Sequence, residues 1–126
     1  MGLTADVNRD DMSSVLALEI LREARARVAR GWCQGTSGED GDGNAIEPWS
    51  PAAQRWSAVG ALVAVWDDLR KASSDREDAI AAFQEANLSL LAVVGGRLRA
   101  WNDMPSRSRN DVITAFDRAI ELARPG

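Results

Sequence analysis

The chain contains no histidine and no tyrosine, and it has a single cysteine, Cys33. The lack of histidine excludes Cys-His and Ser-His catalytic pairs and every histidine-based metal site. A lone cysteine cannot form an intramolecular disulfide, which is typical of proteins in a reducing cytosol. Enzymatic chemistry in this chain would therefore depend on acidic side chains.

Long apolar runs and a basic surface are also missing. The longest apolar stretch, residues 88–94, is interrupted by Ser89 and is far shorter than the roughly 20 residues of a membrane span. Residues 1–11 are polar and acidic, unlike a secretory signal peptide. We therefore expect a flexible segment over residues 1–11, a single helical domain over residues 12–126, a cytoplasmic location and no membrane contact. The net charge of -4 argues against binding to duplex nucleic acid.

The negative charge is concentrated in one Gly-rich segment. No basic residue lies between Arg30 and Arg55, whereas outside this segment acidic and basic residues are equal in number. A loop of this charge can attract a basic partner. We predict that its acids bind a basic protein partner, and the alternative is a solvated loop that only aids solubility. The four acids are Glu39, Asp40, Asp42 and Glu47.

The first predicted helix spans residues 12–30. Apolar residues recur along it at helical spacing and form one stripe. Gly31 follows the last residue of the pattern and is a typical helix stop. The stripe consists of Val15, Leu18, Leu21, Ala24 and Val28.

Three further helices are predicted from their end signals. Ser50 and Pro51 are typical of a cap and first helical position, and the helix they start continues through Trp56 and Leu69. The sequence Ser-x-x-Glu at residues 74–77 is typical of a capping box for the third helix, which Gly95-Gly96 interrupts.

The last predicted helix is capped by Ser108, and Asp111 lies in its first turn. Between the first two helices, Asp42-Gly43 is a strong turn signal, so the Gly/Asp-rich loop there is expected to form a short hairpin. The sequence therefore predicts an all-α protein, a compact bundle of about four helices.

Tryptophan marks the predicted helix ends. Trp32 lies in Gly-Trp-Cys-Gln-Gly, Trp56 follows Arg55, and Trp101 precedes Asn-Asp. A tryptophan in such a setting is an anchor, with a large ring to bury and one N–H that requires a partner. We predict that the three rings meet in one cluster. The structural motif residues are Trp32, Gln34, Arg55, Trp56, Trp101, Asn102 and Asp103.

Asp103 is the one candidate catalytic residue. A carboxylate beside an indole can have a raised pKa and act as a general acid or base. The interpretation that we favour is structural, with Asp103 bonded to backbone N–H groups or to an arginine between Gly31 and Arg55. Cys33 is interpreted as a buried structural thiol because no histidine is present to activate it.

No metal site or cofactor is expected. Asp-x-Asp-x-Asn at residues 40–44 imitates the start of a calcium loop. Ala45 stands where that loop requires Gly, and Pro51 stands where it requires a bidentate Glu.

The order of these motifs resembles that of a family of small uncharacterised helical proteins from bacteria and their phages. The matching segments are residues 31–35, 55–61, 101–105 and 116–120. Ser57 stands where the resemblance leads us to expect Cys, which puts thiol chemistry at that position in doubt. The resemblance implies a prokaryotic or phage context and no known activity.

The leading functional hypothesis is a non-enzymatic protein-binding module, whose partner is a host protein such as a component of a defence system. The first alternative is a small enzyme that uses acidic residues around Asp103. The second is a structural module that associates with itself, for example as a homodimer.

Overall fold

The computed structural model describes the backbone of residues 2–124 and the side chains of residues 12–124. The elements are α1 (Gly2–Arg30), β1 (Gly38–Glu39), β2 (Arg55–Trp56), α2 (Ala58–Ala72), α3 (Arg76–Val94), α4 (Leu98–Asn102) and α5 (Arg109–Ala123). The predicted all-α bundle is confirmed, with one additional short helix, α4. Within the described range, no helix combines the length and apolar character that crossing a membrane requires.

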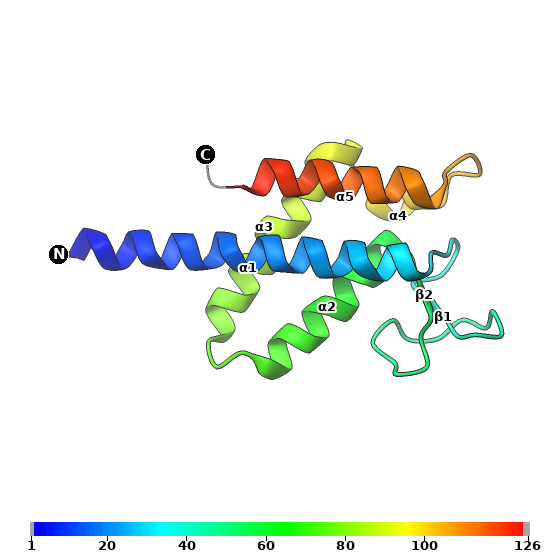
Figure 1. Cartoon of the computed structure of the whole chain (residues 1–126), viewed down its shortest axis with the longest axis horizontal. Coiled ribbons are helices and arrows are strands. Elements are labelled where there is room, and N and C mark those ends of the chain that lie inside the picture. The colour runs from blue at the N-terminus through cyan, green and yellow to red at the C-terminus, as the bar shows by residue number, and fades with distance from the viewer. Residues whose placement is uncertain (1, 125–126) are drawn as a thin grey trace.

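Three helices form the centre of the bundle. Helices α1, α3 and α5 pack against one another, and α2 lies against α1. Figure 1 shows α1 along the full length of the molecule, with α5 beside it in the opposite direction. The start of α1 and the last turn of α5 point to the left in this view, and the two strands lie on the right.

The core is built from small and branched apolar residues. Phe116, Leu21 and Leu90 are fully buried, and so are alanines on α1, α3 and α5. Alanine at these positions lets neighbouring helices approach closely, because no long side chain separates them. The predicted stripe on α1 is buried except for Val15, which is 49% exposed.

Three of the four predicted helix starts are wrong. Helix α1 begins at Gly2 rather than at residue 12, so the helix includes residues expected from the sequence to form a separate N-terminal segment. Residues 3–11 contain neither Gly nor Pro, so no helix breaker stops the helix at the expected caps. Helix α3 is capped by Asp75, whose side chain accepts from the Asp78 N–H, one residue later than the predicted Ser74.

The second helix also begins later than predicted, at Ala58. The Ser50 hydroxyl accepts from the Ala52 N–H at 3.1 Å, but this turn does not continue as a helix. The Gln54 N–H donates instead to the Glu39 carbonyl at 2.8 Å, and the next two residues form β2. Pairing with a distant segment therefore overrides the local capping signal. Ser57 caps α2 by accepting from the Gly60 N–H.

Other end signals are confirmed. Gly95 ends α3 in the left-handed conformation with φ 81°, and Ser108 and Asp111 form a complete capping box on α5. The predicted hairpin is also present, because the Asp40 N–H donates to the Asn44 carbonyl at 2.9 Å across Asp42-Gly43. Strand β1 then pairs antiparallel with β2, Gly38 opposite Trp56.

Gly60 is the point where the loop before β1 meets α2. A Cβ atom at Gly60 would overlap the backbone carbonyl oxygen of Ser37. That carbonyl also accepts from the Ser57 N–H at 3.1 Å, so it is fixed and cannot move aside.

We expect Gly60→Ala to destabilise the fold by about 2–3 kcal/mol, the cost of overpacking a rigid contact. Helix propensity alone has the opposite sign and favours Ala by about 1 kcal/mol. Urea unfolding of the variant and the parent chain measures the difference. An unchanged or higher unfolding midpoint for Gly60→Ala would contradict the close approach.

Candidate functional site

Asn102 joins three segments that are distant in the sequence. It lies at the end of α4, and its side chain is fully buried. Its Oδ1 accepts from Trp32 Nε1 at 2.8 Å and from the Ala58 N–H at 3.0 Å. Its Nδ2 donates to the Cys33 carbonyl at 3.2 Å and to Asp103 Oδ1 at 2.9 Å. The amide thus uses both donors and both acceptor positions. We call residues 31–37, 55–58 and 101–104 the Asn102 corner.

Gln34 and Asp103 close the same corner from either side. Gln34 Nε2 donates to the carbonyls of Asn102 and Met104 at 2.9 and 2.8 Å. Asp103 Oδ1 accepts from the Gly35 N–H at 3.0 Å. This is the backbone contact that the structural interpretation of Asp103 expects. The two sequence motifs that contain Trp32 and Trp101 are therefore one structural unit.

The three tryptophans of this region make separate contacts. Trp56 is buried, donates from Nε1 to the Pro48 carbonyl at 2.9 Å, and has the Arg30 guanidinium 5.3 Å from its ring centroid. The Arg107 guanidinium lies 4.0 Å from the ring centroid of Trp101. The predicted cluster of three rings is wrong. In the described part of the chain the one aromatic ring pair is Trp66 with Phe83.

Two of the four loop acids serve the loop itself. Glu39 pairs with Arg55 at 3.4 Å. Asp40 Oδ1 accepts from the backbone N–H groups of Asn44 and Asp42 at 2.9 and 3.0 Å. These hydrogen bonds lower the pKa of Asp40, and the bond from the Asn44 N–H has the largest effect. The loop is therefore a fixed hairpin, and two acids remain exposed on it. These are Asp42 and Glu47.

Cys33 is buried inside the corner, with its thiol directed at the Thr36 carbonyl at 3.5 Å. Burial raises the pKa of the Cys33 thiol to about 12, and the negative charge of Glu39 acts in the same direction. The thiol is therefore protonated at neutral pH, as a structural cysteine should be.

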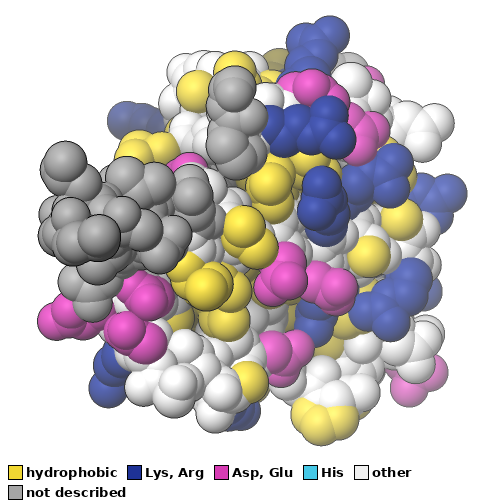
Figure 2. Space-filling model, turned by 60° about the vertical axis from the view of Figure 1, so that its left-hand side comes forward, with side chains coloured by type: hydrophobic (Ala, Val, Ile, Leu, Met, Phe, Trp, Pro, Cys, Tyr) yellow, Lys and Arg dark blue, Asp and Glu magenta, His cyan; other side chains and the backbone are white. Residues whose placement is uncertain are grey.

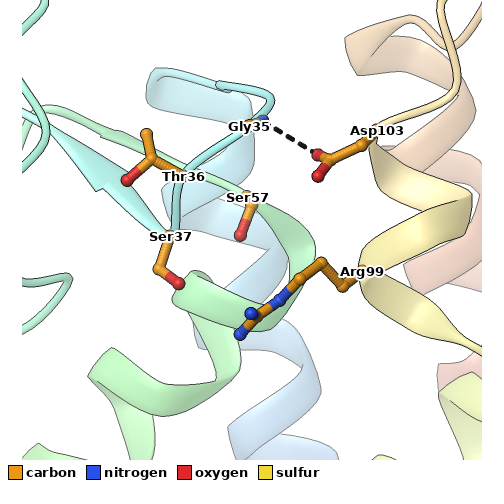
Figure 3. A pocket seen from close by; sticks show the side chains of 6 residues that line it. All are labelled: Gly35, Thr36, Ser37, Ser57, Arg99 and Asp103. Carbon is orange, nitrogen blue, oxygen red and sulfur yellow. Dashed lines mark hydrogen bonds between the residues drawn. The ribbon is translucent and has the colours of Figure 1, made fainter.

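A polar cavity of about 230 Å³ opens beside the corner. Figure 3 shows Arg99 extending from α4 towards the hydroxyls of Ser37 and Ser57, while Asp103 points to Gly35. Arg99 makes no ion pair with any side chain among residues 12–124. The lining residues are Gly35, Thr36, Ser37, Ser57, Arg99 and Asp103.

A larger hollow of about 360 Å³ adjoins this cavity and shares Thr36, Ser37 and Arg99 with it. Its other walls come from the loop before β2 and from α2. We call it the Trp49 groove, because Trp49 lies at its edge and is 50% exposed. The groove is lined by Thr36, Ser37, Ala45, Ile46, Glu47, Pro48, Trp49, Val59, Val63 and Arg99.

Trp49 also borders a third hollow, of about 270 Å³, which is shared with Val63 and carries charged residues of α2. Its indole therefore stands between two concave surfaces. Sequence reasoning missed both Trp49 and Arg99. Neither lies in a motif, and their proximity depends on how the loop folds against α2.

The comparisons with known proteins identify a family. A family model described as a family of unknown function, DUF6197, matches residues 12–122. The chain belongs to DUF6197. The matched range includes the whole Asn102 corner and the whole Trp49 groove. No curated protein and no solved structure matches the chain.

In this DUF6197 protein several polar side chains of the corner are already engaged in holding the fold together. Ser57 Oγ is occupied as the cap of α2, and Asp103 Oδ1 accepts two N–H groups. Among the side chains of residues 12–124, no three potential ligands from Cys, Asp and Glu lie close enough together to hold a metal ion. What remains available in the cavity is a cationic donor, Arg99, beside an apolar groove.

We expect Asn102→Ala to destabilise the protein by about 3–5 kcal/mol, because it leaves several buried partners unsatisfied. Those partners are Trp32 Nε1, the Ala58 N–H and the Cys33 carbonyl. Urea unfolding measures the loss, and Asn110→Ala, at an exposed position on α5, is the control. Equal unfolding midpoints for the two variants would contradict the central role of Asn102.

We expect Cys33 to react slowly with a disulfide reagent at pH 8 in the native protein and rapidly in urea. The fold raises the pKa of the thiol, so the buried neutral thiol makes its full contribution to the free energy of unfolding below the reference pKa of 9.0. Between 9.0 and about 12 the thiol ionises in the unfolded chain but not in the folded one, so this contribution is lost as pH rises. Thermal unfolding of wild type and Cys33→Ala should therefore converge above pH 9.0. Fast native labelling at pH 8 would contradict the burial of the thiol.

Proposed function

We propose that this chain is a non-enzymatic protein-binding module and that its partner docks in the Trp49 groove. The observation that carries the proposal is the indole of Trp49, half exposed between two adjoining hollows. Tryptophan is enriched among the few interface residues that supply most of the binding free energy. Burial of water-exposed indole surface under a partner is favourable and stabilises the complex.

The groove is held in shape before a partner arrives. Pro48, next to Trp49, is buried, and its carbonyl accepts from the indole N–H of Trp56. The Ile46 N–H donates to the Gly38 carbonyl at 3.0 Å, which ties the other end of this wall to β1. A wall fixed in this way loses little conformational entropy on binding, which favours affinity.

The lining of the groove combines apolar and charged side chains, as protein interfaces do. Ile46, Val59 and Val63 supply apolar surface, and Glu47 and Arg99 supply charge. Together with Asp42, Glu47 would attract basic residues of the partner around the groove and increase the association rate. This retains part of the role that the sequence predicts for the acidic loop.

The resemblance to proteins of bacteria and their phages supports a partner from a bacterial host, including a component of a defence system. Membership of DUF6197 is compatible with this proposal.

Self-association is the second candidate, and a different surface favours it. Figure 2 shows apolar side chains in the middle of one face, with acidic and basic side chains around them. Exposed apolar residues on the helices include Met12 and Val15 of α1, Ile80 of α3 and Leu122 of α5. If this chain is a homodimer, light scattering will give twice the mass of the chain.

We expect Trp49→Ala to reduce partner capture from a bacterial lysate at least tenfold, the effect of losing a central interface tryptophan. Trp49 is half exposed, so the variant should fold normally, which thermal unfolding checks. The matched control is Leu88→Ala, which removes an apolar side chain that is 65% exposed on α3, outside the groove. Capture of the same protein by wild type and Trp49→Ala in equal amounts would overturn the proposal.

A further inference from the structure

We propose that the segment of the partner that enters the groove is its C-terminus, and that Arg99 binds the terminal carboxylate inside the polar cavity. This inference rests on the proposed function and adds to it the chemical class of the ligand. It is carried by the position of Arg99, which lines both the polar cavity and the apolar groove.

Arg99 is an exposed residue whose guanidinium lines the polar cavity without a partner. Its guanidinium forms no hydrogen bond or ion pair with the part of the chain that the structure describes, and neither does the Ser37 hydroxyl. Figure 3 shows both groups directed into the same space. A guanidinium offers parallel N–H donors that match the two oxygens of a carboxylate. The cavity is therefore suited to an anion with two or three acceptor atoms.

The charge of the cavity favours a carboxylate over a phosphate. Arg99 is the one basic residue in the lining, and Asp103, four residues further along the chain, adds a carboxylate to the same lining. A phosphate monoester carries roughly two negative charges at pH 7. Asp103 would repel either anion, but it would oppose the phosphate more strongly than a carboxylate, whose single charge Arg99 balances.

The neighbouring groove indicates what the carboxylate is attached to. Arg99 and Ser37 line both hollows, whereas the apolar residues Ile46, Pro48 and Val59 line the groove alone. A terminal carboxylate lies within a few bonds of the last side chain of its chain, so an apolar last residue would lie in the groove while Arg99 holds the carboxylate. Beyond it, Trp49 and the third hollow extend the surface for preceding residues. A polypeptide C-terminus with apolar final residues fits this sequence of surfaces, and capture of a terminal carboxylate is a known mode of peptide recognition.

The test uses a library of fluorescent hexapeptides whose last four positions are varied, prepared both as free acids and as C-terminal amides. Fluorescence anisotropy with the full chain gives the Kd of each pair. We expect selected peptides to end in apolar residues and to bind as free acids at least tenfold more tightly than as amides, a difference typical of a charge-assisted hydrogen bond.

Three variants test whether Arg99 causes the preference for free acids. Arg99→Gln should reduce the ratio of amide to acid Kd to about one, and Arg99→Lys, which keeps the charge but loses the paired donors, should give an intermediate ratio. Arg97→Gln is the matched control, because it removes the same charge from an exposed residue that caps the same short helix outside the cavity. Its ratio should equal that of wild type.

Equal affinity of free acids and amides would overturn the inference, and so would a preference for phosphorylated peptides or failure of every free acid to bind. An acid preference that persists in Arg99→Gln would also overturn it. These results leave the proposed function to be decided by the capture experiment with Trp49→Ala, which requires no carboxylate.

Discussion

The buried side-chain amide of Asn102 is the interaction on which the rest of the structure depends. An amide without water must find a partner for each polar atom, or the fold loses the free energy of its desolvation. Here the partners come from the chain after α1, from the first residue of α2 and from the residue after α4. Placing Asn102 therefore places the ends of three helices at once. Such fully satisfied polar networks favour one arrangement over others, because any shift leaves buried groups unpaired.

The groove follows from the same constraint. Residues 33–57 contain little regular structure, yet their backbone bonds to the corner, to β2 and to α2 hold them in place. Gly31 and Gly60 allow this, because each brings a backbone within a distance that no Cβ would tolerate. The segment that looks most like a loose loop in the sequence is thus a rigid wall. A concave surface on such a wall is ready to bind without reorganisation.

The sequence predicts those features that depend on neighbouring residues. The cap at Ser108, the interruption at Gly95-Gly96 and the turn at Asp42-Gly43 are local, and the structure contains all of them. A local helix-start signal gives a wrong prediction where the same residues can pair with a distant segment of the chain. Ser50 and Pro51 have the right residues to start a helix, but the pairing of Arg55 and Trp56 with β1 is more favourable.

The candidate site depends almost wholly on such distant pairing. The motifs around Trp32 and Asn102 can be recognised separately in the sequence, but nothing in their spacing shows that an indole of one binds an amide of the other. No sequence motif marks Arg99 or Trp49, because they are candidate site residues only through the cavities that the folded loop forms beside them. Conversely, Glu39 and Asp40 appear available in the sequence and are engaged by Arg55 and by the turn.

The large sequence separation of these contacts has a consequence for the order of folding on the ribosome. Trp32 and Asn102 are 70 positions apart, so the hydrogen bond between them cannot form until α1, α2 and α3 have all been synthesised. Closing a contact over so long a stretch of chain costs entropy that local contacts do not. While the chain is growing, the segment after α1 lacks its partner, and its indole and carbonyl groups remain hydrated. The Asn102 corner therefore forms only after α4 has been synthesised, and a chain terminated before residue 102 would carry the earlier helices without it.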